Sequence, residues 1–223
     1  MQNQSDSPKP SARSRRTQLE RREEATRRIL DSAIALISEK GMAGVTMREI
    51  GARSGYSRAL TAHHYGDKEG LLVALVEQIG VNIRQGRLAS SRAKPGLESV
   101  LEIVRFYLGT EPAQVMLLQA FHAILSEGRS AGGPVASALE RLTRESAAYI
   151  EAELRAGVEA GEIRADLDPA GTSMAILGTM RGLSAQRMSG VSEGSAEDIR
   201  DAMVRIIERG LRPDPAAHQS VRQ

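Results

Sequence analysis

The chain has 223 residues, of which 41% are hydrophobic and 26% are charged, and its formal net charge is only +2 at pH 7. A chain of this length is expected to fold around an apolar core as one large domain or two smaller ones. The absence of cysteine excludes disulfides and thiolate metal sites, and two Phe without any Trp predict an aliphatic core. We expect a cytoplasmic protein, because no apolar run approaches the roughly 20 residues of a membrane-spanning helix and the basic N-terminus lacks the apolar segment of a secretory signal.

The positive charge is concentrated in the first third of the chain. Residues 1–72 carry 13 Lys/Arg against 9 Asp/Glu, whereas the remainder has a small acidic excess. A basic end is expected where that end meets a polyanion such as DNA, although a solvated basic tail explains the same numbers. Residues 1–16 are polar and rich in Ser, Pro and Arg, which predicts a disordered arm, and residues 212–223 predict a disordered tail.

Apolar residues recur at helical spacing along most of the chain, beginning with a helix from about Glu20 to Lys40 that stops at Gly41. No strand pattern is present, so the expected fold class is all-α with about nine helices. Later helices are expected over residues 68–88, 97–109, 112–126, 135–160, 169–187 and 195–211, with Gly- and Ser-rich loops over 126–134 and 189–195.

Two very short helices are expected between these longer ones. Thr46 and Glu49 form a capping-box pattern that opens a helix over 46–54, and Ser57 caps a second helix over 58–64. Two helices joined by a three-residue turn that contains Gly are typical of a helix-turn-helix, whose second helix enters the major groove of DNA.

The adjacent pair His63-His64 raises the alternative of a metal site. Neighbouring residues on a helix do not face each other, and two histidines that share one ion are usually three or four residues apart. No cysteine or suitably spaced carboxylate completes a ligand set. We therefore expect no metal site and no cofactor.

Residues 20–72 resemble the DNA-binding domain of the TetR family of bacterial transcriptional regulators. The resemblance depends on an ordered set of residues, namely Ala33, Leu36, Gly41, Gly44 to Ile50, Gly55-Tyr56-Ser57, His64-Tyr65 and Lys68 to Leu72. The chain departs from the family at Thr61, where a bulky aliphatic residue is usual, and at Ala62, where a tyrosine often touches the DNA backbone. The resemblance implies a helix-turn-helix DNA-binding domain over 17–67 and a helical effector-binding and dimerisation domain over 68–211.

The resemblance and the side-chain chemistry together indicate the DNA-binding residues. Arg58 is the strongest candidate for sequence reading. Arg48 is expected to reach a guanine edge, because arginine can donate two hydrogen bonds to one guanine, and the alternative is a phosphate or solvent partner. His64 is expected to brace the structure instead. The arm residues Arg13, Arg15 and Arg16 are expected to add sequence-independent affinity. The full set of expected contacts is Thr46, Met47, Arg48, Ser57, Arg58, Ala59, Leu60, His63, Tyr65 and Lys68.

A single helix-turn-helix covers too few bases for genomic specificity, so we expect a homodimer on a palindromic operator. The last two helices offer apolar residues alternating with small ones, which favours a four-helix bundle across the dimer axis, although core packing within one subunit is the alternative. The expected interface residues are Met174, Leu177, Gly178, Gly182, Ala185, Ile199, Met203 and Ile206.

The resemblance also implies a small-molecule effector site among the central helices, with helix 68–88 as the lever between this site and the DNA. The candidate lining residues are Phe106, Met116, Phe121, His122, Met180 and Arg181, any of which can instead be simple core. The expected function is thus a ligand-responsive repressor and not an enzyme, since the chain has no G-x-S-x-G, phosphate loop or H-E-x-x-H. A DNA-associated protein without an effector is the remaining alternative, and the lack of an enclosed cavity among residues 97–188 would favour it.

Overall fold

The computed structural model describes residues 17–90, 94–190 and 194–214. These residues form nine α-helices and no strand, so the expected all-α fold class is confirmed. The helices are α1 (Gln18–Lys40), α2 (Met47–Ser54), α3 (Arg58–Tyr65), α4 (Lys68–Ser90), α5 (Leu97–Tyr107), α6 (Pro112–Ala131), α7 (Gly133–Glu159), α8 (Pro169–Met188) and α9 (Ala196–Leu211).

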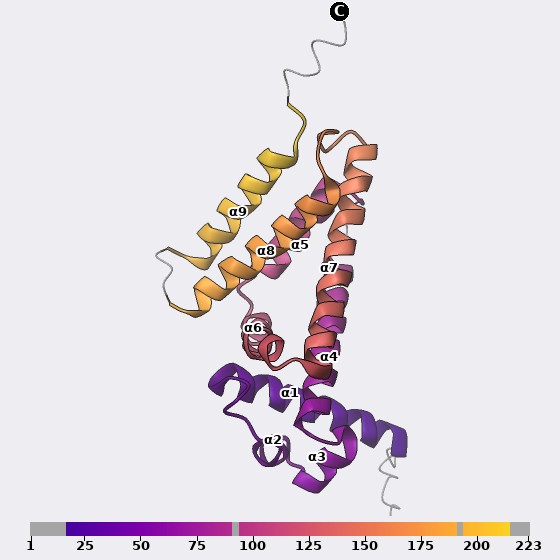
Figure 1. Cartoon of the computed structure of the whole chain (residues 1–223), viewed down its shortest axis with the longest axis vertical. Coiled ribbons are helices and arrows are strands. Elements are labelled where there is room, and N and C mark those ends of the chain that lie inside the picture. The colour runs from indigo at the N-terminus through magenta and orange to yellow at the C-terminus, as the bar shows by residue number, and fades with distance from the viewer. Residues whose placement is uncertain (1–16, 91–93, 191–193, 215–223) are drawn as a thin grey trace, which may run out of the picture.

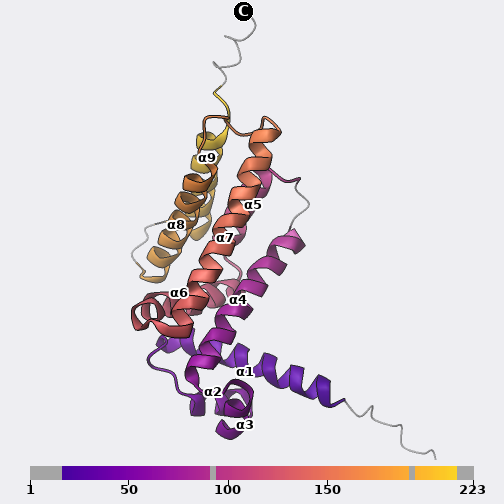
Figure 2. The same cartoon turned by 45° about the vertical axis from the view of Figure 1, so that its right-hand side comes forward.

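The molecule is elongated, with a small N-terminal lobe of α1–α3 at one end and a larger helical body above it (Figure 1). The long helix α4 rises from the lobe into the body, where it packs along α7 (Figure 2). Helix α9 packs against α5 and lies beside α8, far from α2 and α3 (Figures 1 and 2). None of the described helices combines the length and the apolar character needed to cross a membrane.

The interior consists of two clusters of buried apolar side chains. The lower cluster joins α1, α2 and the first half of α4 to the middle of α6 and the start of α7. The upper cluster joins α5 and the end of α7 to α8 and α9. Helix α1 and two short helices alone bury too little surface to be stable, so the N-terminal lobe completes its core with residues such as Phe121 and Ile124 of α6.

The helix starts follow the local capping signals. Thr17 and Glu20 form a capping box at α1, and Thr46 and Glu49 form the expected one at α2. Asp168 accepts hydrogen bonds from the amides of Ala170 and Gly171 at the start of α8, whose first residue is proline. Each side chain satisfies amides that have no partner within the helix, which is why these boundaries are legible in the sequence.

The expected loop over 126–134 is wrong, because α6 continues to Ala131 and a single residue, Gly132, separates it from α7. Gly128 lies inside α6 where α7 approaches closely, and a Cβ atom there would lie 2.9 Å from a methyl carbon of Val135. The Gly-rich composition therefore reflects close helix packing followed by a turn at Gly132, whose φ is 71°. The boundary between the two domains stays a prediction, as do the arm and the part of the tail that lie outside the described residues.

Candidate nucleic-acid interface and central polar cluster

The helix-turn-helix forms at the tip of the N-terminal lobe (Figure 1). Helix α2 ends at Gly55, which has a left-handed conformation with φ of 79°, and Ser57 caps α3 by accepting a hydrogen bond from the Leu60 amide at 3.1 Å. Gly51 lets the two helices meet, because a Cβ atom there would lie 3.0 Å from the Tyr56 carbonyl oxygen. The turn thus depends on glycine at two positions.

Helix α3 has one face toward the lobe and one toward solvent. Thr61 is fully buried, and its hydroxyl donates to the Ser57 carbonyl at 3.1 Å, so the polar atom is satisfied where the family usually has an aliphatic side chain. Arg58, Ala59 and His63 are exposed on the other side. Solvent-facing residues at positions one, two and six of α3 form a surface with the width of one helix, which is the shape that enters a major groove.

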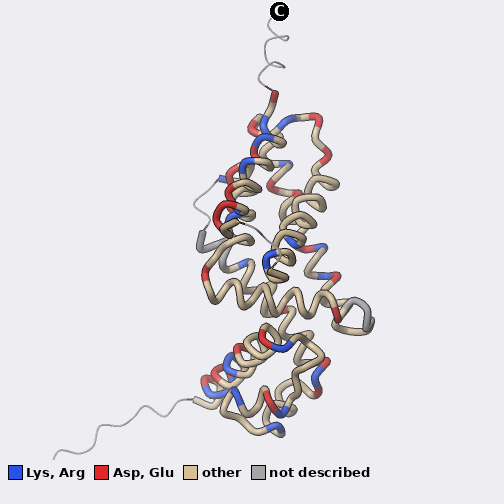
Figure 3. The backbone as a smooth tube through the Cα atoms, turned by 90° about the vertical axis from the view of Figure 1, so that its left-hand side faces the viewer, with Lys and Arg blue, Asp and Glu red and all other residues tan. Residues whose placement is uncertain are grey.

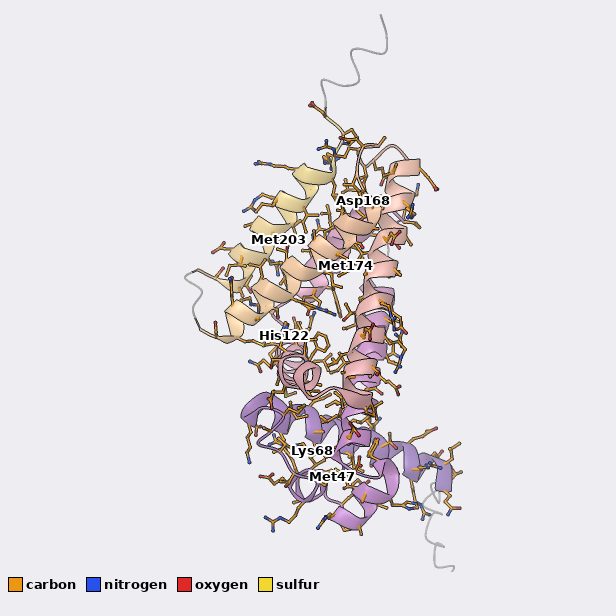
Figure 4. The ribbon with its side chains drawn as sticks, in the orientation of Figure 1. Met47, Lys68, His122, Asp168, Met174 and Met203 are labelled. Atoms are coloured by element: carbon orange, nitrogen blue, oxygen red, sulfur yellow. The ribbon has the colours of Figure 1, made fainter. Side chains whose placement is uncertain are left out.

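The remaining expected DNA contacts occupy the edges of this surface. Arg48 is exposed on α2, whereas Met47 is half-buried and packs against the lower cluster (Figure 4). Neither Arg48 nor Arg58 forms an ion pair or hydrogen bond with any other described residue. Both guanidinium groups are therefore available to an external partner. Figure 3 shows that basic residues reach the tip of the lobe.

Tyr65 and Lys68 are tied to the protein itself. The Tyr65 hydroxyl donates to the Thr26 carbonyl of α1 at 3.3 Å, and burial raises the pKa of this phenol. The Lys68 Nζ donates to the Met42 carbonyl at 2.7 Å. Phosphate contacts by these two residues stay predictions, and an ammonium still has two further protons to donate. His64 is half-buried and its pKa is lowered, chiefly by burial, which agrees with a bracing role.

A carboxylate from α6 holds the loop that precedes α2, a contact that the sequence did not predict. Glu127 accepts hydrogen bonds from the backbone amides of Met42 and Ala43 at 3.0 and 2.9 Å. Lys68 at the start of α4 donates to the carbonyl of Met42. The peptide group between Met42 and Ala43 is therefore held at its carbonyl by α4 and at its amide by α6. These partners are 85 residues apart in the case of Glu127 and Met42, so no local pattern could have revealed the contact.

A cluster of polar side chains lies at the centre of the molecule, where the two apolar clusters meet. The Tyr107 hydroxyl lies 3.4 Å from His122 Nε2, and Arg181 donates to the Thr143 hydroxyl at 3.1 Å. The Arg181 guanidinium also lies over the ring of Phe121, with its carbon 5.4 Å from the ring centre. Four helices, α5 to α8, thus each contribute one polar side chain, and Figure 4 shows His122 midway between the lobe and the upper helices.

The structure separates the expected effector residues into two groups. Phe121, His122 and Arg181 meet in the central cluster, and Met180 is buried beside them in the upper cluster. Met116 is 36% exposed and Phe106 is half-buried, and neither takes part in the contacts that define the central cluster. Sequence reasoning missed Tyr107 and Thr143, which complete the cluster from α5 and α7.

Three of the hollows in the described part of the molecule lie near these elements. One of about 220 Å³ lies between α6 and α7 and is lined by Leu125, Ala136, Leu139, Glu140 and Thr143. A second, of about 260 Å³, lies between α4 and α7, and a wider groove of about 610 Å³ lies between α1 and α4. Only the first reaches a residue of the central cluster, namely Thr143. Among the described residues, no group of His, Asp or Glu side chains has the composition of a metal site.

The expected dimer residues also divide by exposure. Met174 of α8, labelled in Figure 4, is 53% exposed, and Ile206 of α9 is 66% exposed. Apart from the backbone of α8 itself, no atom lies within 4 Å of the position of a Cβ at Gly178 or Gly182. Ala185 is exposed on the same helix and Ile199 is half-buried. Leu177 and Met203 instead pack into the upper cluster, because they lie on the inward faces of their helices.

An exposed helix-turn-helix at the tip of an otherwise helical body defines a two-part helix-turn-helix protein, and comparison with known proteins identifies its kind. The family model for bacterial regulatory proteins of the tetR family matches residues 29–75, and the tetracyclin repressor-like C-terminal domain matches residues 120–210. The chain belongs to the TetR family. The expected resemblance of residues 20–72 is therefore confirmed, and residues 120–210 of the body match the family as well.

Individual relatives are distant. The chain is 35% identical over 65 residues to the HTH-type transcriptional regulator BetI of Rhizobium meliloti, covering 29% of this chain and 32% of that protein. It is 28% identical over 142 residues to the HTH-type regulatory protein RaaS of Mycobacterium tuberculosis, covering 64% and 61%. The matches thus span about a third and about three fifths of these relatives. A putative transcriptional regulator from Saccharomonospora viridis, solved with choline, superposes with a TM-score of 0.78 at 20% identity over 86% of this chain and all of that one.

Proposed function

We propose that the chain is a homodimeric transcriptional repressor that binds a palindromic operator and leaves it when a small molecule binds among the central helices. The observation that carries the proposal is the outward face of α3, where Arg58, Ala59 and His63 are exposed at the tip of the lobe beside Arg48 of α2. A guanidinium with no internal partner can donate both hydrogen bonds to one guanine edge, which is the usual means of reading that base. Such binding would place the protein on the chromosome in the cytoplasm.

The open face of α8 and α9 supports the dimer. Met174 and Ile206 are large apolar side chains left in water, and the glycines between them allow a second helix to approach closely. A two-fold axis through this face would bring together two copies of α8 and α9, and it would present two copies of α3 to successive turns of the major groove.

The hydrogen bonds from α4 and α6 to the Met42 backbone support a coupling between effector binding and DNA binding. Helices α4 and α6 both extend from the region of the central helices to the loop before α2. Each carries a side chain, Lys68 or Glu127, that forms a hydrogen bond with the Met42 backbone. A ligand that favours one arrangement of these helices would therefore tilt α2 and α3 with them. Release from DNA then follows from a difference in ligand affinity between the two arrangements.

Operator binding can be tested by fluorescence anisotropy, with palindromic duplexes drawn from the DNA that flanks the gene. We expect binding by a dimer, a preference for the palindrome over a scrambled duplex, and a steep loss of affinity with salt, because neutralised phosphates release counterions. Equal affinity for palindrome and scrambled DNA would refute the proposal of sequence-specific regulation.

A DNA-binding protein without an effector is the second candidate. The hollow of about 220 Å³ between α6 and α7 is open to solvent and not enclosed, so it does not decide against this alternative. The convergence of Tyr107, His122, Thr143 and Arg181 from four helices is what favours a ligand-binding body. The same anisotropy assay with candidate ligands distinguishes the two, since only a regulated protein changes its DNA affinity.

A further inference from the structure

The central cluster has the composition of a binding site for one polar group. Tyr107, His122, Thr143 and Arg181 come from four different helices and converge through the 3.4 Å contact between Tyr107 and His122 and the 3.1 Å contact between Arg181 and Thr143. A further hydrogen bond links Tyr107 to Arg181. Polar groups in an aliphatic interior are costly to bury, so a convergence of this kind is a common mark of a ligand site.

The cluster carries a positive charge at neutral pH. Burial raises the pKa of Tyr107 to about 12, and burial together with the nearby Arg181 charge lowers the pKa of His122 to about 4. The phenol and the imidazole are therefore uncharged, as is the Thr143 hydroxyl. Among these four side chains only Arg181 is charged, and it presents a planar fork of donors that matches a carboxylate.

The hollow between α6 and α7 has apolar walls and meets the cluster at Thr143, while Arg181, Tyr107 and His122 are not among the residues that line it. Leu125, Ala136 and Leu139 line it, and it reaches Thr143, whose hydroxyl accepts the hydrogen bond from Arg181. The remaining lining residue, Glu140, is exposed and its carboxylate lies 3.5 Å from Arg144, so its charge is partly compensated at the surface.

We propose that the central cluster binds the carboxylate of a small aliphatic acid, with Arg181 and Tyr107 as donors and the hollow between α6 and α7 around the alkyl chain. The proposal rests on the proposed function, because it names the class of effector at the site described there. Thr143 is a positioning residue: its hydroxyl donates to the Leu139 carbonyl at 2.8 Å and accepts from Arg181, which fixes the guanidinium. A quaternary ammonium such as the choline in the Saccharomonospora viridis structure would meet the Arg181 charge with the same sign.

Calorimetry on the full chain tests the ligand class. Butyrate, isovalerate, hexanoate and octanoate are titrated alongside the primary amides of the same acids and choline. We expect at least one acid to bind at least about tenfold more tightly than its amide, since the Arg181 guanidinium forms a stronger hydrogen bond with a charged carboxylate than with a neutral amide. Absence of binding by all four acids at millimolar concentration, or equal affinity for acid and amide, would overturn the proposal, and so would tighter binding of choline.

Variants then locate the site. Arg181→Met and Tyr107→Phe should each weaken the acid at least about tenfold, and Arg181→Met should abolish its advantage over the amide. Arg105→Met removes an exposed arginine of α5 that pairs with Glu98, and it should leave affinity unchanged. Circular dichroism verifies folding, and Tyr107→Phe decides the outcome if Arg181→Met is unfolded. Retained affinity in a folded Tyr107→Phe variant would refute this placement.

Operator binding is measured on the same preparations without ligand. If the chain recognises its operator but binds none of the acids, the ligand class is wrong while the proposed regulator stands. If it shows no preference for any palindrome yet binds an acid through Arg181, the regulator proposal fails and the site remains.

Discussion

The tip of α3 and the centre of the body contain the same kinds of side chain in opposite settings. Arg58 and His63 are exposed, and Arg58 has no hydrogen bond or ion pair within the described residues, whereas Arg181 and His122 are half-buried among aromatic rings and hydroxyls. The first pair can meet only a partner outside the protein. The second pair is held in place by four helices, so any partner it takes is small and changes how those helices pack. Surroundings, more than residue type, distinguish the proposed DNA-reading surface from the proposed ligand site.

The largest effect is expected at the proposed dimer face of α8, because binding of a palindromic operator requires two subunits. Gly178→Glu places a carboxylate on the open face of α8, where no atom lies within 4 Å of the new Cβ, so the single subunit should fold normally. In a two-fold dimer the two carboxylates would face each other, and we expect the dimer to dissociate and operator affinity to fall by about 100-fold or more. Analytical ultracentrifugation and anisotropy measure both. Ala152→Glu on the exposed side of α7 is the matched control, and an intact Gly178→Glu dimer would exclude this face as the interface.

The next effect tests the outward face of α3 directly. Arg58→Ala should reduce operator affinity by about 10- to 100-fold while affecting scrambled DNA much less, because a bidentate arginine–guanine pair contributes about 1–3 kcal/mol of discrimination. Arg144→Ala, an exposed arginine on α7, is the control. Anisotropy with both duplexes gives the ratio. An equal loss on both duplexes would mean that Arg58 contacts phosphate and reads no base.

The link between the two regions can be broken at Glu127. Glu127→Ala removes the acceptor of the part-buried Met42 amide and of the exposed Ala43 amide. Water can replace the acceptor at Ala43, whereas a buried donor left without a partner costs about 1–3 kcal/mol, so the loss at Met42 is expected to be the larger one. We expect faster hydrogen exchange at these two amides, lower stability and a weaker effect of ligand on DNA affinity. Glu111→Ala is the control, since Glu111 precedes α6 without a side-chain capping bond. Unchanged hydrogen exchange at Met42 and Ala43 would show that the hydrogen bonds to Glu127 do not hold the loop.

The helices of the N-terminal lobe could be predicted from the sequence because the residues that set their ends are close together in the chain. Thr46 with Glu49, Gly55 and Ser57 lie within twelve positions and specify two helix starts and one stop without help from the rest of the chain. The central cluster could be read only in part: its four polar residues pair across gaps of 15 and 38 positions, and their meeting depends on how α5 to α8 cross. A lone tyrosine or threonine on a helix carries no sign of such a partner.

The loop over 126–134 failed for the opposite reason, since its local signal was misleading. Glycine and serine are typical of loops, but Gly128 is buried where α6 meets Val135 of α7, so the missing side chain serves packing. In the same way, Leu177 and Met203 belong to the apolar stripes expected at a dimer interface, yet they face the upper cluster. Periodicity identifies a buried face without saying whether the same subunit or a second one covers it.

The smallest effect is a pH dependence of stability to which His122 of the central cluster should contribute. The pKa of His122 falls from 6.5 to about 4 in the folded protein, first because of burial and then because of the Arg181 charge. The imidazole is therefore favoured in its neutral form: its contribution to stability is complete above pH 6.5 and is lost progressively as the pH falls toward 4, because the unfolded chain takes up a proton that the folded chain does not. Thermal unfolding between pH 7.5 and 4.5 should show a declining midpoint in the wild type and a shallower decline in His122→Gln. His64, whose pKa is also lowered, leaves a residual slope, and His63→Gln on the exposed face of α3 serves as the control. If the unfolding midpoints of His122→Gln and the wild type decline in parallel, burial does not keep the His122 imidazole neutral. The contrast between the exposed pair Arg58 and His63 and the half-buried pair Arg181 and His122 would then lose its physical basis.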